Sequence, residues 1–355
     1  MKRRHFIALD VHCAFTELAA VRETGNVALK ERCATTIPTL VTIIHKVPRP
    51  RSLVLEEGAL ADWLWRNLRA HVDDMVVCNP RRNHLIAKEG EKDDPIDAEK
   101  LAQLYRGGYI KAVHHGDSLG RAIFKQHVAL YHDLVRQRVR QAQHVMALVR
   151  RHGVFVRERH FAKPESRAGL LTRLPESRLL RNDVRLLWKG YDLACAQEEY
   201  ARRILVRLAK KQEVLERFVQ LPGIAWVRAA TLYVWLDTPW RFRSKSALWK
   251  YLGIGLERRH SGTGPENLRV PFVVNRLLKT TILGAAKSAV LQGDNAFAEQ
   301  YRRWLENGLS PRMARRNVAR SLATTLWGMW KNGSAYQPDW VGVAGAANKA
   351  VEVSV

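Results

Sequence analysis

Acidic residues stand where two predicted strands end. Asp10 closes the apolar run 6–9, and Glu56 and Glu57 follow the apolar run 53–55. Carboxylates at the edge of an open α/β sheet are held by rigid backbone, where such sheets bind ligands. Each also has a plain explanation, because aspartates form turns at strand ends and a glutamate pair can face solvent. The strand pattern favours Glu56 over Glu57 as a ligand and leaves both open.

A second acidic pair opens a predicted helix. With Asp94 as N-cap and Pro95 at the first helical position, Asp97 falls in the same first turn. Both carboxylates then project from one helix end. Aspartates are also favoured there by the helix dipole alone, so a purely capping role is the alternative.

The acids together match what phosphoryl transfer requires. Two-metal catalysis holds divalent ions about 4 Å apart, so several carboxylates must converge. Oxygen ligands suit Mg²⁺ or Mn²⁺ rather than zinc. The candidate set comprises Asp10, Glu56, Asp94 and Asp97.

A serine in a glycine-rich loop is a candidate nucleophile. Ser261 follows Arg258, Arg259 and His260, whose side chains could stabilise charge on a phosphate. An ordinary Ser-Gly turn explains the same residues, and pattern alone does not single out this serine.

Two further segments are candidates for phosphate contacts. A Leu-Pro-Gly-Ile turn resembles a helix-hairpin-helix turn, whose N–H groups can bind phosphate, with Gly223 and Arg228 as contacts. Arg312, Arg316 and Arg320 recur every fourth residue and share one face of a predicted helix. Pro-Gly turns and solvated helix faces also occur without any nucleic acid. We expect the tryptophans at 235, 240, 327 and 330 to belong to the core.

The composition points to a polyanionic partner. The 355 residues carry a formal net charge of +25, and 46% of them are hydrophobic, enough for a sizeable core. No apolar run approaches the roughly 18 residues that cross a bilayer. With four scattered cysteines and no signal-peptide pattern, we expect reduced thiols and a cytoplasmic protein.

The pattern of elements predicts an α/β domain followed by helical domains. Strands are expected at 6–9, 16–21, 27–35, 53–55 and 75–78, with helices at 60–68 and 94–105. Long helices at 121–151 and 198–218 should pair as an antiparallel hairpin, and a mostly helical unit should follow. The predicted segments are 1–115 (α/β), 116–215 (helical hairpin or coiled coil), 216–335 (helical, with the serine) and 336–355 (a flexible tail, loose from about Gly333).

In order and spacing these motifs resemble the IS110 transposase family, in its IS1111-like branch, from about residue 5 to residue 333. The family's DEDD motif matches Asp10, the Glu56-Glu57 site, and the Lys-x-Asp-x-x-Asp-Ala pattern that contains Asp94 and Asp97. Its later motifs match Leu-Pro-Gly-Ile at 221–224, Tyr-Leu-Gly at 251–253 and His-Ser-Gly at 260–262. The chain departs from relatives in carrying two consecutive glutamates at the second acidic site.

The resemblance implies a ribonuclease-H-like (RuvC-like) N-terminal domain and a C-terminal transposase domain. It implies that the four acids bind Mg²⁺ and that Ser261 forms a phosphoserine ester during strand cleavage and rejoining. It also implies DNA as substrate, a structured guide (bridge) RNA encoded by the element, a homo-oligomer (dimer or tetramer) and a place in the bacterial cytoplasm near the nucleoid.

Three other functions remain open at this point. A metal-only endonuclease of the Holliday-junction resolvase type would use the same acids with water as nucleophile. A non-catalytic nucleic-acid-binding protein would use the acids only as caps. An inactive transposase relic is the third.

Overall fold

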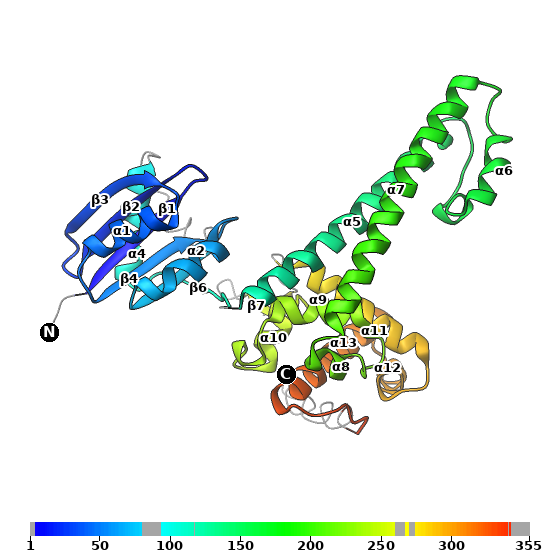
Figure 1. The fold of residues 1–355 in the computed structure, drawn as a ribbon. Helices are drawn as coiled ribbons and strands as arrows, with labels where there is room; N and C mark the ends of the chain where they lie inside the picture. Colours follow the sequence, from blue (N-terminus) through cyan, green and yellow to red (C-terminus); the bar gives the residue numbers. More distant parts are fainter. Residues whose placement is uncertain are drawn as a thin grey trace. The chain divides into compact units, whose positions relative to one another are not determined.

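The structure, a computed structural model, describes residues 4–79, 94–116, 118–259, 267–269, 274–339 and 341, without the side chains of 94–96, 257–259 and 267–269. The chain forms two compact units, Met1–Ala122 and Ile123–Val355 (Figure 1). The finer division of the chain into four segments stays a prediction.

The first unit is built on a sheet of order β3-β2-β1-β4-β5-β6. The first three strands are antiparallel neighbours, β4 and β5 run parallel to β1, and β6 returns antiparallel at the edge. The strands are β1 (His5–Val11), β2 (Phe15–Arg22), β3 (Val27–Ala34), β4 (Arg51–Glu56), β5 (Asp74–Cys78) and β6 (Ala112–Val113). The sequence predicted the first five, whereas β6 is too short to carry a pattern of its own.

Helices cover both faces of this sheet. On one face α1 (Ile37–Lys46) and α2 (Ala61–Leu68), with the turn η1 (Arg69–His71), cover Leu9 and Leu55. On the other face α4 (Asp94–Arg106) packs Leu101 and Ala102 against Ala8 and Val54 (Figure 1). The sheet order and its single antiparallel inner strand confirm the predicted ribonuclease-H-like fold. Helix α1 was not predicted; Thr36 caps it by accepting a hydrogen bond from the Thr39 N–H.

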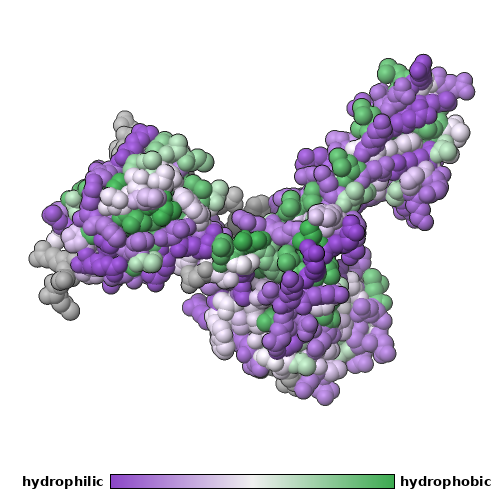
Figure 2. Space-filling view, in the orientation of Figure 1, coloured by the Kyte–Doolittle hydropathy of each residue, from purple (hydrophilic) through white to green (hydrophobic). Residues whose placement is uncertain are grey.

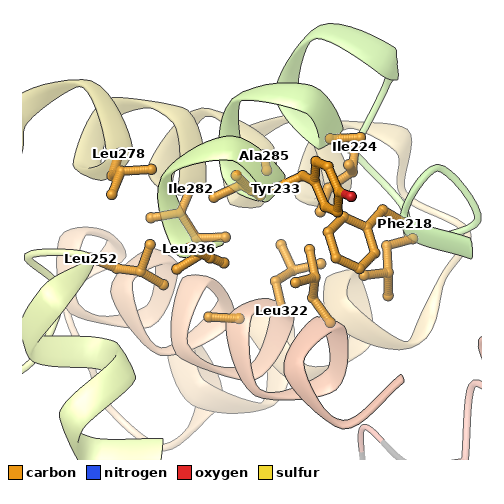
Figure 3. Close-up of a cluster of buried hydrophobic side chains, with 14 of the residues drawn as sticks. Phe218, Ile224, Tyr233, Leu236, Leu252, Leu278, Ile282, Ala285 and Leu322 are labelled. Carbon is orange, nitrogen blue, oxygen red and sulfur yellow. The ribbon is translucent and has the colours of Figure 1, made fainter. Parts of the chain in front are cut away.

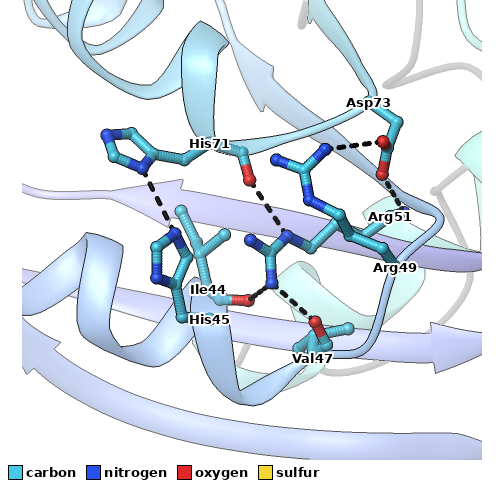
Figure 4. Close-up of polar contacts among 7 residues, drawn as sticks. All are labelled: Ile44, His45, Val47, Arg49, Arg51, His71 and Asp73. Atoms are coloured by element: carbon cyan, nitrogen blue, oxygen red, sulfur yellow. Dashed lines mark hydrogen bonds and ion pairs between the residues drawn. The ribbon is translucent and has the colours of Figure 1, made fainter.

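A buried arginine fastens the end of the sheet that lies away from the acids. Arg51, at the start of β4, donates to the carbonyls of Ile44, Val47 and His71 at 2.7–3.0 Å (Figure 4). Two of these bonds go to carbonyls at the C-terminal end of α1, those of Ile44 and the C-cap residue Val47, where the helix's own N–H donors run out. Asp73 accepts from the Arg51 N–H at 2.8 Å. The start of β4 is therefore bonded to the connection from α1 and to the connection that leads into β5.

A long antiparallel hairpin of α5 (Leu119–Arg150) and α7 (Arg178–Ala209) follows, and all but the first turn of α5 belongs to the second unit (Figure 1). The second helix runs from Arg178 to Ala209, whereas the sequence predicted 198–218, so the prediction was wrong at both boundaries. Ser177 caps it, and Trp188 and Tyr191 pack on Phe161 of the hairpin tip. The tip holds η2 (Glu158–His160), η3 (Pro164–Ser166) and α6 (Arg167–Leu171).

A helical core follows the hairpin. Phe218, Ile224, Tyr233, Ile282 and Leu322 meet at its centre (Figure 3). Its helices are α8 (Glu213–Phe218), α9 (Trp226–Leu236), η4 (Pro239–Arg241), α10 (Lys245–Tyr251), α11 (Arg276–Gln292), α12 (Ala296–Glu306) and α13 (Pro311–Asn332). This arrangement confirms the mostly helical unit that hydrophobic periodicity predicted.

Two features of this unit differ from the prediction. A short hairpin of β7 (Glu257–Arg259) and β8 (Asn267–Arg269) interrupts the helices. The chain after Gly333 was expected to be loose, yet Tyr336 stacks on Phe297 and Val341 is buried. Residues 342–355 lie outside the described part of the chain.

The visible surface of both units is predominantly hydrophilic, with scattered hydrophobic patches (Figure 2). Within the described ranges, no helix combines the length and apolarity needed to cross a membrane.

Candidate active site and nucleic-acid contacts

Asp10 and Glu56 lie side by side at the carboxyl ends of two parallel strands. Leu9 pairs with Leu55 across β1 and β4, so each acid occupies the next position on its strand. Because strand side chains alternate between faces, both acids share the face of Ala8 and Val54. That is the face on which α4 packs. Two acids 46 positions apart in the chain are thus neighbours at one sheet edge.

The third acidic cluster begins the helix on that same face. Asp97 is exposed in the first turn of α4, directly before Ala98, which is buried. The backbone of Asp94 starts the helix, and its side chain lies outside the described residues. Helix α4 packs on β1, β2 and β4. Among the side chains described, no three acidic, histidine or cysteine groups converge closely enough to hold a metal ion.

The carboxylates nevertheless fit a divalent metal in kind. Asp10, Glu56 and Asp97 supply only oxygen donors, which hard divalent cations prefer. None of these three carboxylates is buried, so none of them places an uncompensated charge in the core.

Two residues beside Asp10 were missed by the sequence analysis. His12 Nε2 lies 3.3 Å from Asp10 Oδ2, and its ring stacks on Phe15. Glu17 stands directly opposite Asp10 in the β1–β2 pair. Its side chain is only 8% exposed and pairs with Arg32. A charged residue inside the otherwise apolar run of β2 was the signal that could have pointed to Glu17.

The second glutamate of the pair has a different environment. Glu57 Oε2 lies 2.7 Å from Nε2 of His115, whose Nδ1 lies 2.8 Å from Asp62. The backbone N–H of Glu57 donates to Cys78. Burial alone would lower the pKa of His115, but hydrogen bonds and charge from Glu57 and Asp62 outweigh it and raise that pKa. Glu57 thus has a structural partner in His115, and the assignment of Glu56 as the metal ligand stays a prediction.

The candidate nucleophile lies outside the described residues. Ser261 and His260 belong to the connection between β7 and β8. Arg258 and Arg259 lie on β7, whose backbone pairs with β8, and their side chains are not described. The functional predictions for these four residues are therefore untested.

The predicted phosphate-binding turn is occupied by protein contacts. Gly223 has φ +79°, and a Cβ there would stand 2.2 Å from the Ala285 carbonyl oxygen of α11. Arg228 donates to the Gly223 carbonyl at 2.6 Å and to Ser288 at 2.9 Å. Burial lowers the pKa of Arg228. These contacts give both residues a packing role, and their contact with nucleic acid stays a prediction.

The arginine stripe of α13 divides into two kinds of residue. Arg320 donates to the Ile254 carbonyl at 2.9 Å and lies over the Trp249 ring, so it joins α13 to the end of α10. Arg312 is exposed and Arg316 half-buried. Burial and the charge of Arg312 lower the pKa of Arg316. Arg312 is thus the exposed residue of the stripe, and Arg316 and Arg320 are both half-buried.

Comparison with known families agrees with this architecture. Residues 7–153 match the DEDD model of IS110 transposases, described as "Transposase". Residues 215–302 match the model described as "Transposase IS116/IS110/IS902 family". The two matches together cover well over half of the chain. No curated protein matches it.

A ribonuclease-H-like domain with acids at one sheet edge, followed by a helical transposase region, defines a DNA transposase, an enzyme whose partner is DNA. The chain belongs to the IS110 family. Its DEDD domain indicates the use of a divalent metal.

Proposed function

We propose that this transposase cleaves and rejoins DNA through a phosphoserine intermediate, with Mg²⁺ or Mn²⁺ held by Asp10, Glu56, Asp94 and Asp97. One observation carries the proposal: the register of β1 and β4 places Asp10 beside Glu56, on the face of the sheet that α4 covers. The bound cation would supply Lewis-acid stabilisation of charge on the scissile phosphate. The four acids would hold that cation, which neutralises their negative charge where the phosphate binds.

In this mechanism the Ser261 Oγ attacks the scissile phosphorus as its proton leaves to a base. A P–O ester bond to serine forms, the strand's own P–O bond breaks, and a strand hydroxyl departs with a proton. Attack by the hydroxyl of the exchanged strand reverses these changes and restores serine. The total number of phosphate ester bonds stays constant, so resealing needs no nucleotide energy. Arg258, Arg259 and His260 would stabilise the charge on the phosphate.

The substrate in vivo is proposed to be the ends of an insertion element, selected by a structured RNA that the element encodes. The net charge of +25 supports a nucleic-acid partner and is compatible with both DNA and RNA. We further propose that the chain is a member of the IS1111-like branch and acts near the bacterial nucleoid in the cytoplasm.

A homo-oligomer is part of the proposal. Leu179, Leu186, Leu193 and Tyr200 recur every seventh residue along α7, and each side chain is more than 60% exposed. They lie on a different face from Leu180, Val184 and Trp188, which pack inside the hairpin. A seven-residue apolar repeat is the pattern by which helices pair in coiled coils. This second stripe supports association of the hairpins of two copies.

The covalent step is tested with the full chain, the element's flanking noncoding RNA and labelled DNA carrying the element's ends, in Mg²⁺ or Mn²⁺. The wild type should give a protein–DNA adduct that survives denaturation, and Ser261→Ala should not. Ser246→Ala is the matched control, an exposed serine outside the candidate loop. Cleavage by Ser261→Ala with no adduct in the wild type would instead establish the metal-only endonuclease mechanism.

A further inference from the structure

Trp240 lies on the surface of the second unit, although the sequence predicted it in the core. Its side chain is 71% exposed on η4, the short turn between α9 and α10. Its neighbours Pro239 and Phe242 are buried. The other three tryptophans of that prediction are half-buried against the helical core, as expected. The exposed indole therefore stands out from the packing around it.

The turn that carries Trp240 is held firmly. The Trp327 indole N–H donates to the Pro239 carbonyl at 2.7 Å. Thr238 Oγ1 accepts from the Trp240 N–H at 3.4 Å. On the other side, Arg241 donates to the Trp235 carbonyl at 3.0 Å and lies over the ring of Tyr251. An aromatic ring presented by fixed backbone loses little conformational freedom when a ligand stacks on it.

The sequence around this indole is rich in cations. The segment 238–256 contains Arg241, Arg243, Lys245 and Lys250, and the acids Asp237 and Glu257 flank it. From α13, Lys331 Nζ reaches 3.9 Å from the Trp327 ring and 5.2 Å from the Trp240 ring. An exposed aromatic ring flanked by cations is the combination that binds single strands, since bases stack on the ring while cations neutralise the backbone.

We infer that Trp240 is a stacking site for an unpaired base of single-stranded DNA, with Lys331 and Arg243 beside the phosphates. The charge complementarity favours a polyanion over an apolar protein surface. It favours a single strand over a duplex because the bases of a duplex are already stacked on one another. The inference rests on DNA as the partner of this transposase and is independent of the proposed metal and serine chemistry.

The test measures binding of the full chain to labelled oligothymidine, to a duplex of equal length and to oligouridine, without divalent metal. Trp240→Ala should raise the Kd for oligothymidine by about 5- to 100-fold and Trp240→Phe by much less, because stacking contributes most of that affinity. Duplex binding should change less than about twofold, since it depends on phosphate contacts. Tyr109→Ala is the matched control, because Tyr109 is an aromatic residue of similar exposure, 65%, in the first unit.

A second measurement protects the result against misfolding of the alanine variant. Oligothymidine should quench part of the tryptophan emission of the wild type, and that part should be missing in Trp240→Phe. Unchanged oligothymidine affinity in Trp240→Ala would overturn the inference. Equal losses for strand and duplex, or a loss confined to oligouridine, would overturn it as well. Metal-free binding separates these outcomes from any failure of the cleavage mechanism.

Discussion

The imidazole Nε2 of His115 lies 2.7 Å from the carboxylate of Glu57, directly after the proposed ligand Glu56. With its side chain only 5% exposed, His115 also contacts Asp62 of α2. It follows β6 in the chain, so it ties the last segment of the first unit to the connection after β4. The ion pair with His115 therefore holds Glu57 in place, directly after the proposed metal ligand Glu56.

We predict that His115→Ala lowers stability by about 1–2 kcal/mol at acidic to neutral pH, because two carboxylates lose a charged partner. The folded-state pKa of His115 is raised above its ordinary value of 6.5. Its contribution is therefore complete below about pH 6.5 and disappears as pH rises through the raised folded-state pKa. Denaturant unfolding of both proteins across pH should show the two curves converging at alkaline pH. A gap that does not change with pH would contradict the ion-pair account.

Replacing each of the two consecutive glutamates separately by glutamine distinguishes their roles. Glu56→Gln should reduce metal-dependent strand cleavage by about 100-fold or more, since it removes a proposed ligand. Glu57→Gln should keep most of the activity, because its carboxylate already serves His115. Cleavage measured against Mn²⁺ concentration checks both variants. A larger loss in Glu57→Gln than in Glu56→Gln would reverse the assignment.

Gly223→Ala should destabilise the helical core by at least about 2 kcal/mol, through overpacking and a left-handed backbone. The new Cβ would stand 2.2 Å from the Ala285 carbonyl oxygen. Gly293→Ala is a matched control, with the same φ of +79° and no atom within 4 Å of a new Cβ. Thermal unfolding should show the larger loss at Gly223. Equal losses would mean that backbone conformation alone, and not close packing on α11, requires this glycine.

Arg320 and Arg316 of the α13 stripe should respond differently to mutation. Arg320→Ala should cost about 1–2 kcal/mol of stability, because the Ile254 carbonyl loses its donor. Arg316→Ala should leave stability nearly unchanged and weaken DNA binding. The slope of log affinity against log salt concentration should fall by about one, which corresponds to one lost phosphate contact. Unfolding and salt-dependent binding assays on both variants check this. Arg316→Ala with unaltered affinity would remove that residue from the interface.

Charge placed on the exposed stripe of α7 should separate an oligomer. The double variant Leu186→Glu and Leu193→Glu should elute and sediment as a smaller species than the wild type at equal concentration. Leu291→Glu is the control, since Leu291 is 75% exposed at the end of α11 and outside the seven-residue repeat. An unchanged mass in the double variant would exclude this stripe as the contact between copies.

The sequence by itself determined the type of most of the elements that carry the candidate acids, and the family. Apolar runs that end in Asp10 and Glu56, and an Asp-Pro helix start at Asp94, depend on local backbone preference and hydrophobic periodicity, which are readable from neighbouring residues. The order of the acidic clusters along the chain was likewise sufficient to predict a ribonuclease-H-like domain.

Tertiary structure decided which residues become neighbours. Strand register sets Asp10 beside Glu56 and opposite Glu17, and the return of the chain at β6 brings His115 to Glu57. Packing made Gly223 a helix contact, and left Trp240 outside a core that its hydrophobic character had predicted. These outcomes depend on contacts between residues far apart in sequence, and local patterns carry no information about which distant surface a side chain will meet.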